Sequence, residues 1–182
     1  MLDLARTLGE IRTVVDIGAN QGFFAIAARK WFPNAVIHAY EPNTALHDVL
    51  ESNAGAVEAK VFWEAVGSTP GTVELELFDD TNLTRAHRSD QGAFPLVPFA
   101  TVAERIGGTI DLLKLDCEGW EWEILEAAAV RNVRILTMEY HLAETSLTHD
   151  DVGPWLAKRA FSLLKQRRLS DFGQVLGIRC SS

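Results

Sequence analysis

The segment most informative about the architecture of this chain reads Thr13-Val14-Val15-Asp16-Ile17-Gly18-Ala19-Asn20-Gln21-Gly22. A β-branched run that ends in glycine predicts a buried strand followed by a tight turn. Residues 21–32 predict a helix that ends before Pro33, and the apolar run 35–40 predicts a second strand. Strand, helix and strand in this order indicate a right-handed βαβ unit within a parallel sheet.

The remaining segments continue the alternation of strands and helices. We expect further helices at 2–10, 42–53, 100–106, 120–130 and 150–159, and further strands at 57–66, 72–78, 110–116, 133–140, 161–169 and 174–180. The last two strands flank Ser170-Asp171-Phe172-Gly173, which predicts an antiparallel hairpin. Residues 79–98 are polar and interrupted by proline and glycine, so they predict a long loop. The expected fold class is α/β, with helices on both faces of a mostly parallel sheet.

Length and charge narrow the class of protein. A chain of 182 residues predicts a single domain, 1–182. The net charge of −8 argues against a nucleic-acid partner, because phosphate binding needs a basic surface. Two cysteines, no signal-peptide pattern and no apolar run long enough for a membrane span predict a cytoplasmic protein without a disulfide framework. The sequence is also compatible with a homodimer.

Acidic residues follow several of the predicted strands. They include Asp16, Glu41, Glu64, Asp116 and Glu139. Ligands of open parallel sheets bind at the carboxyl ends of the strands, where the strand order reverses. These acidic residues therefore predict a polar ligand site at that edge of the sheet.

The first turn and the second strand together predict the kind of ligand. Gly18 and Gly22 have the spacing Gly-x-x-x-Gly, which lacks the middle glycine of a pyrophosphate-binding loop. Glu41 ends the second strand, where a carboxylate can accept both hydroxyls of a ribose. We expect an adenosine-type ligand without a pyrophosphate. In the alternative interpretation, the glycines only form a tight turn, and Glu41 only stabilises the N-terminus of the next helix.

Four segments resemble the FkbM family of S-adenosylmethionine-dependent methyltransferases. They are Val15-Asp16-Ile17-Gly18-Ala19-Asn20-Gln21-Gly22, Tyr40-Glu41-Pro42-Asn43, Ala65-Val66-Gly67 with Gly71-Thr72-Val73-Glu74-Leu75, and Leu113-Lys114-Leu115-Asp116-Cys117-Glu118-Gly119-Trp120-Glu121. The resemblance spans about residues 12–141. It implies a Rossmann-like class I methyltransferase fold with a seven-stranded sheet whose last strand is antiparallel. The C-terminal hairpin predicted above agrees with this fold independently.

The resemblance also implies roles for single residues toward S-adenosyl-L-methionine. The methionine end would be held at Asp16, Gly18, Ala19, Asn20 and Gly22. Glu41 would bind the ribose diol, with Asn43 beside the adenosine and with Glu64 and Ala65 bordering the adenine. Asp116 would lie near the methionine amino group or near the acceptor.

A hydroxyl acceptor must lose a proton when it is methylated, so a base is expected. His141 ends the strand 133–140 and is the first candidate, with Asp116 and Glu118 as rivals. These three residues and Glu139 could instead bind a hard cation, but no metal-binding spacing supports this, and we expect no metal. Cys117 lies between carboxylates, which disfavours a thiolate nucleophile.

Two further expectations concern charged residues near the site. Lys114 has the same strand parity as Asp116, which predicts a pairing with a carboxylate of the site. The polar residues of the long loop could form a lid, contact the acceptor or simply be solvated; they are Asn82, Thr84, Arg85, His87 and Arg88.

The sequence thus predicts methyl transfer to a hydroxyl of a small molecule such as a natural product, a sugar or a glycolipid. An NAD-dependent oxidoreductase and a non-catalytic S-adenosylmethionine-binding module are the alternatives. An oxidoreductase would need a pyrophosphate site, which the Gly-x-x-x-Gly turn argues against.

Overall fold

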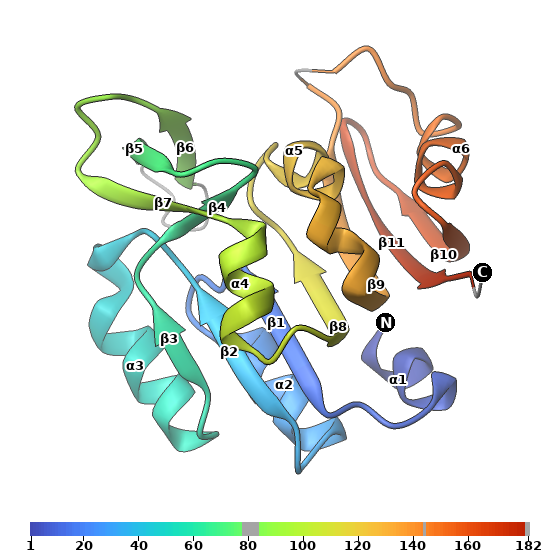
Figure 1. The fold of residues 1–182 in the computed structure, drawn as a ribbon, viewed down its shortest axis with the longest axis horizontal. Coiled ribbons are helices and arrows are strands. Elements are labelled where there is room, and N and C mark those ends of the chain that lie inside the picture. Colours follow the sequence, from blue (N-terminus) through green and yellow to red (C-terminus); the bar gives the residue numbers. More distant parts are fainter. Residues whose placement is uncertain (78–83, 144, 181–182) are drawn as a thin grey trace.

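Seven strands form the main sheet of the computed structural model, which describes residues 1–77, 84–143 and 145–180 (Figure 1). In spatial order they are β10 (Phe161–Arg168), β11 (Phe172–Arg179), β9 (Val133–His141), β8 (Ile110–Leu115), β1 (Thr13–Ile17), β2 (Val36–Tyr40) and β3 (Lys60–Phe62). β11 runs antiparallel to both of its neighbours, and the other pairs are parallel. The predicted sheet with its C-terminal antiparallel hairpin is confirmed.

Helices cover both faces of this sheet (Figure 1). One face carries α1 (Leu2–Ala5), α2 (Phe23–Trp31) and α3 (His47–Ala56), with short 3₁₀ helices at Arg6–Leu8 and Thr44–Leu46. The other face carries α4 (Phe99–Arg105) and α5 (Glu121–Glu126), followed by a 3₁₀ helix at Ala128–Asn132. α6 (Val152–Ala157) packs on β10. None of the helices in the described ranges is both long enough and apolar enough to cross a membrane.

Alternation along the central strands explains why both faces are covered. Val14 and Leu112 are buried in the cluster that includes α2, whereas Val15 and Leu113 are buried in the cluster that includes α4 and α5. Neighbouring strand residues point to opposite faces, so an apolar run hides both of its sides only between two layers of helices.

A second sheet of four strands corrects two expectations. Its order is β4 (Ala65–Gly67), β7 (Phe94–Pro98), β5 (Gly71–Leu77) and β6 (Thr84–Arg88). The strand predicted at 57–66 is therefore two strands in two different sheets. The loop predicted at 79–98 contains β6 and β7, because pairing with β5 and β4 outweighs its polar, proline-containing composition. Asn82, for which a lid, an acceptor contact and a solvated position were all left open, lies outside the described residues.

The predicted helices are shorter than expected at three places. The segment 120–130 is α5 followed by a 3₁₀ turn, 2–10 is α1 with a 3₁₀ turn, and 42–53 starts as a 3₁₀ turn before α3. Helix ends often tighten into 3₁₀ geometry, so the expected positions are right and only the regularity is overestimated.

The strand order reverses between β1 and β8. β1 pairs with β2 on one side and with β8 on the other, and the chain proceeds away from this point in both directions. The loops after β1 and β8 therefore diverge and leave a crevice at their carboxyl ends. The second sheet lies over the same end of the molecule (Figure 1).

Candidate functional site

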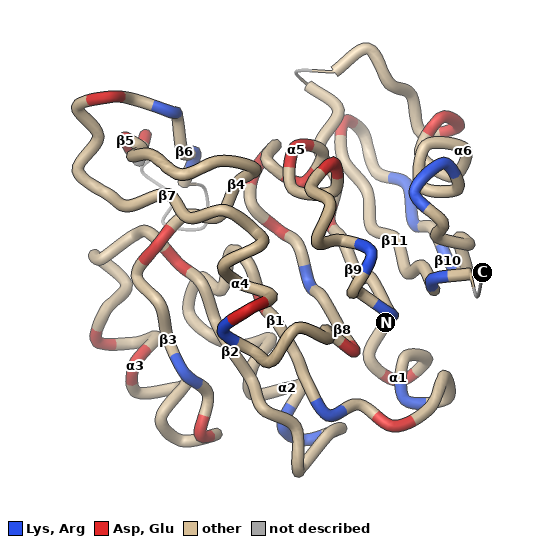
Figure 2. Tube along the Cα trace, in the orientation of Figure 1, with Lys and Arg blue, Asp and Glu red and all other residues tan. Residues whose placement is uncertain are grey.

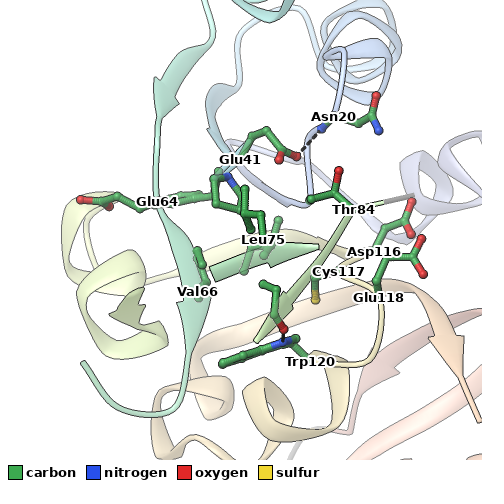
Figure 3. A pocket seen from close by; sticks show the side chains of 16 residues that line it. Asn20, Glu41, Glu64, Val66, Leu75, Thr84, Asp116, Cys117, Glu118 and Trp120 are labelled. Carbon is green, nitrogen blue, oxygen red and sulfur yellow. Dashed lines mark hydrogen bonds between the residues drawn. The ribbon is translucent and has the colours of Figure 1, made fainter. Parts of the chain in front are cut away.

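A pocket lies at this crevice, between the carboxyl ends of the main strands and the second sheet (Figure 3). Seven of the predicted site residues line it: Gly18, Asn20, Glu41, Glu64, Ala65, Asp116 and Glu118. The second sheet adds Leu75, Thr84 and Ala86, and the start of α5 adds Trp120. Of these four, Thr84 was named in the predicted loop and Leu75 and Trp120 within the family motifs, whereas Ala86 was not named, because the cover belongs to a sheet that was not expected.

Gly18 brings the first loop against the end of β8. Its φ is +77°, and a Cβ at this position would stand 1.8 Å from the carbonyl oxygen of Asp116. Gly22 has a φ of +83° and caps α2, where a Cβ would meet Leu50. Both glycines therefore serve the packing of the turn, and Gly22 does not line the pocket.

Glu41 ties the second strand to this turn. Its two carboxylate oxygens accept hydrogen bonds from the backbone N–H groups of Asn20 and Asn43, both at 2.9 Å. Burial raises the pKa of Glu41, while these two hydrogen bonds oppose the rise. Each carboxylate oxygen has a second lone pair, so Glu41 can still accept hydroxyl donors from the pocket.

Asn43 and Glu64 contribute differently from what was expected. The side chain of Asn43 accepts a hydrogen bond from the backbone N–H of Ala45 and donates one to the Thr84 hydroxyl at 3.1 Å. It therefore connects the main sheet to the second sheet, and it does not line the pocket. The carboxylate of Glu64 forms an ion pair with Arg105. In Figure 3 it points away from the other labelled side chains.

Asp16 is fully buried under the first loop, not exposed in the pocket. The register of β1 and β8 sets it opposite Lys114, whose Nζ lies 3.1 Å from Asp16 and 3.5 Å from Asp116. Burial alone would lower the pKa of Lys114, but these two carboxylates outweigh it and raise the pKa. The expected pairing of Lys114 with a site carboxylate is observed.

The carboxylates of Glu118 and Glu121 lie next to the ring of His141 at the edge of the pocket. Its Nδ1 lies 3.2 Å from Glu121, and its Nε2 lies 3.3 Å from Glu118. Burial alone would lower the pKa of His141, but the hydrogen bond and charge of Glu121, with the charge of Glu118, raise the pKa to about 9. Glu121 was quoted only as part of a family motif, because a glutamate in a first helical turn is ordinarily solvated.

Asp116, Glu139 and His141 also present ligand atoms within 4.8 Å of one another. Both ring nitrogens of His141, however, face carboxylates. The ring is therefore held in an ion-paired cluster of carboxylates, and the function proposed below does not use a metal.

The cysteine of this turn has the properties expected of an unreactive thiol. Burial, followed by the charges of Glu121 and Asp116, raises the pKa of Cys117 well above its usual value. A thiolate is therefore disfavoured at neutral pH.

The raised pKa of His141 makes the stability of the protein pH-dependent. The folded-state pKa lies above the ordinary value of 6.5, so the stabilisation is complete below about pH 6.5 and is lost as the pH rises through about 9. We expect up to about 3 kcal/mol to be lost over this range. Urea unfolding of the wild type and of His141→Gln between pH 6 and pH 10 measures the difference, which should be large at the acid end and small at the alkaline end. The ionisable groups that influence His141 are Glu121, Glu118, Asp116, Glu139 and Asp171.

The difference in pH slope between the wild type and His141→Gln arises from the ion pairs between the His141 ring and its neighbouring carboxylates. An equal pH slope in the wild type and in His141→Gln would contradict the ion pairing described here. His47, which is exposed and forms its ion pair with Asp48, provides the matched control, and His47→Gln should leave the slope unchanged.

A wider groove opens on the α2 side of the same strand ends. Phe23, Glu139 and Gln174 are among the residues that line it, and Gly18, Asn20 and Asp116 line both the groove and the pocket. Molecules bound in the two recesses would therefore approach each other at Asp116. Figure 2 shows acidic positions around this edge, whereas lysines and arginines lie along β10 and directly after the end of α6.

Solved structures with this fold include methyltransferases of several kinds. A ribosomal protein L11 methylase from Lactobacillus delbrueckii subsp. bulgaricus is 14% identical, with a TM-score of 0.58, over 98% of this chain and 76% of that one. A putative tRNA (m1A22) methyltransferase from Streptococcus pneumoniae, solved with S-adenosyl-L-methionine, is 14% identical, with a TM-score of 0.56, over 98% of this chain and 71% of that one. At this identity the likeness concerns the fold alone.

Sequence comparison is more specific. The protein named methyltransferase sdnD from Sordaria araneosa is 29% identical over 171 residues, and the match covers 69% of this chain and 66% of that protein's length. Residues 16–163 match the family model of the methyltransferase FkbM domain. The match covers most of the chain and contains every residue that lines the pocket. The chain therefore belongs to the FkbM methyltransferase domain family.

Proposed function

We propose that the protein transfers a methyl group from S-adenosyl-L-methionine to a hydroxyl of a small molecule, such as a sugar, a glycolipid or another natural product. The observation that carries this proposal is the buried carboxylate of Glu41 beside the turn Gly18–Asn20, at the point where the strand order reverses. A carboxylate there suits a ribose diol, and a turn without a third glycine suits an adenosine ligand without a pyrophosphate.

The residues of the pocket fit such a ligand. Glu41 has free lone pairs for the ribose, and Ala65 and Leu75 provide apolar surface for a base. Asp116 and Glu118 also line the pocket, where their carboxylates favour a cation. When bound, S-adenosyl-L-methionine supplies a methyl group on a positively charged sulfur. The task of this chain is to hold and align the acceptor beside it.

Glu118 is the better proton acceptor among the three candidates. His141 is held in its protonated form between two carboxylates and has no free lone pair at neutral pH. Glu118 lines the pocket, and burial raises its pKa, which makes its carboxylate a stronger base than an exposed one. During methyl transfer, in which the C–O bond forms and the C–S bond of the methyl donor breaks, Glu118 would take up the hydroxyl proton and then release it to water.

Binding of S-adenosylhomocysteine provides the first test. We expect this ligand, and not NAD, to stabilise the folded protein, because binding to the native state alone raises its stability by about 2.7 kcal/mol at a hundred times Kd. Thermal unfolding with each ligand at millimolar concentration measures the effect. Stabilisation by NAD alone would instead support the oxidoreductase alternative.

Turnover separates an enzyme from a binding module. The protein is incubated with S-adenosyl-L-methionine and a panel of neutral glycosides, hydroxylated natural products and, as the contrasting class, tRNA. Release of S-adenosylhomocysteine together with an O-methylated glycoside or natural product is the expected result. Methylation of tRNA, or methylation at nitrogen, would replace the proposed acceptor class.

A further inference from the structure

Glu121 is a fully buried carboxylate at the start of α5 that does not line the pocket. We propose that it is the positioning residue of the site, which holds both the turn that presents Glu118 and the ring of His141. This inference rests on the function proposed above for the same pocket. Under this proposal, the side chain of Glu121 determines the positions of Glu118 and His141.

The first task of Glu121 is to hold the turn after β8. Its two oxygens accept hydrogen bonds from the backbone N–H groups of Cys117, at 2.9 Å, and Gly119, at 3.0 Å. These two residues flank Glu118, whose φ of +54° lies in the left-handed region. That conformation is unfavourable for a non-glycine residue, so it needs support from its surroundings. The two hydrogen bonds provide this support on both sides of Glu118.

The second task is to orient the imidazole. An oxygen of Glu121 lies 3.2 Å from Nδ1 of His141, which directs the other ring nitrogen toward Glu118 at 3.3 Å. The ring also stacks on Phe172, and the His141 carbonyl accepts a hydrogen bond from the Trp122 indole. The position of Glu118 is thus fixed through its backbone by Glu121 and through its carboxylate by His141.

Only a carboxylate can perform both tasks. It offers acceptors alone, and here it receives three donors, namely Cys117 N–H, Gly119 N–H and the His141 ring. A glutamine has the same shape but only one acceptor oxygen and no charge. Glu121→Gln would therefore turn an N–H group toward one of the two amides and remove the strongest partner of the imidazolium.

The experiment follows the His141 ring by NMR titration in the wild type, in Glu121→Gln and in Glu126→Gln. Glu126 lies at the other end of α5 and pairs with Arg159, so the same substitution there is the matched control. We expect the titration midpoint of His141 to fall by about one pH unit or more in Glu121→Gln and to stay in place in Glu126→Gln. An unchanged midpoint in Glu121→Gln would overturn the proposal.

A second measurement needs no variant and covers the case in which Glu121→Gln fails to fold. Amide hydrogen exchange in the wild type should show Cys117 and Gly119 protected at least about tenfold more than Glu118 between them, whose backbone N–H donates no hydrogen bond to any of the described residues. Equal exchange would also overturn the proposal. Neither readout depends on a methyl donor, so a failure here is distinct from a failure of the wild type to bind S-adenosylhomocysteine.

Discussion

Replacing Gly18 by alanine is expected to destabilise the fold by more than about 3 kcal/mol and to abolish binding of S-adenosylhomocysteine. The added Cβ would stand 1.8 Å from the Asp116 carbonyl oxygen, where no side chain can give way because the neighbour is backbone. The left-handed φ of +77° adds a further cost of about 1 kcal/mol. The loop after β1 would have to move away from β8, which would widen the pocket where Gly18 lines it. Denaturant unfolding and calorimetric titration measure the two effects.

Two other glycines separate the steric part from the conformational part. Gly108 has a φ of +91° with nothing near its missing Cβ, so Gly108→Ala should cost only about 1 kcal/mol. Gly55 lies in α3 with open space around it, and Gly55→Ala should stabilise the protein by about 0.5–1 kcal/mol. If Gly18→Ala proved no worse than Gly108→Ala, the close approach of the loop to β8 would be contradicted.

Glu41→Gln is expected to weaken binding of S-adenosylhomocysteine by about 10- to 100-fold. Hydrogen bonds to a charged acceptor contribute roughly 1.5–3 kcal/mol, which corresponds to this range of affinity. The amide that replaces the carboxylate also loses one of the two acceptors that hold Asn20 and Asn43. The ribose site and the loop beside it would both be impaired. Isothermal titration with the folded variant gives the affinity directly.

Glu64→Gln serves as the comparison within the same pocket. Its carboxylate is held by Arg105 and points away from the pocket interior, so the affinity for S-adenosylhomocysteine should change by less than about threefold. Equal losses in Glu41→Gln and Glu64→Gln would show that the carboxylate of Glu64 also binds the adenosine. In that case the role that the sequence predicted for it would be restored.

Local patterns in the sequence were sufficient to predict the main sheet. The apolar run that begins at Thr13, its glycine turn and the segment before Pro33 each depend on neighbours in the chain, and all appear as predicted. Because parallel strands end at a common edge, the acids Glu41 and Asp116 could also be assigned to one pocket in advance. These features follow from the periodicity of side chains and from turn chemistry, which are local properties.

The tertiary structure alone decided how the site is covered and held. β6 and β7 form because distant strands supply their hydrogen-bond partners, which their own composition does not reveal. Gly18 is needed for its contact with Asp116, and Glu121 is buried because His141 and the turn around Glu118 surround it. Each of these contacts joins residues that only the folded chain brings together. The sequence thus determined which chemical groups reach the site, and long-range packing determined how those groups are oriented and charged.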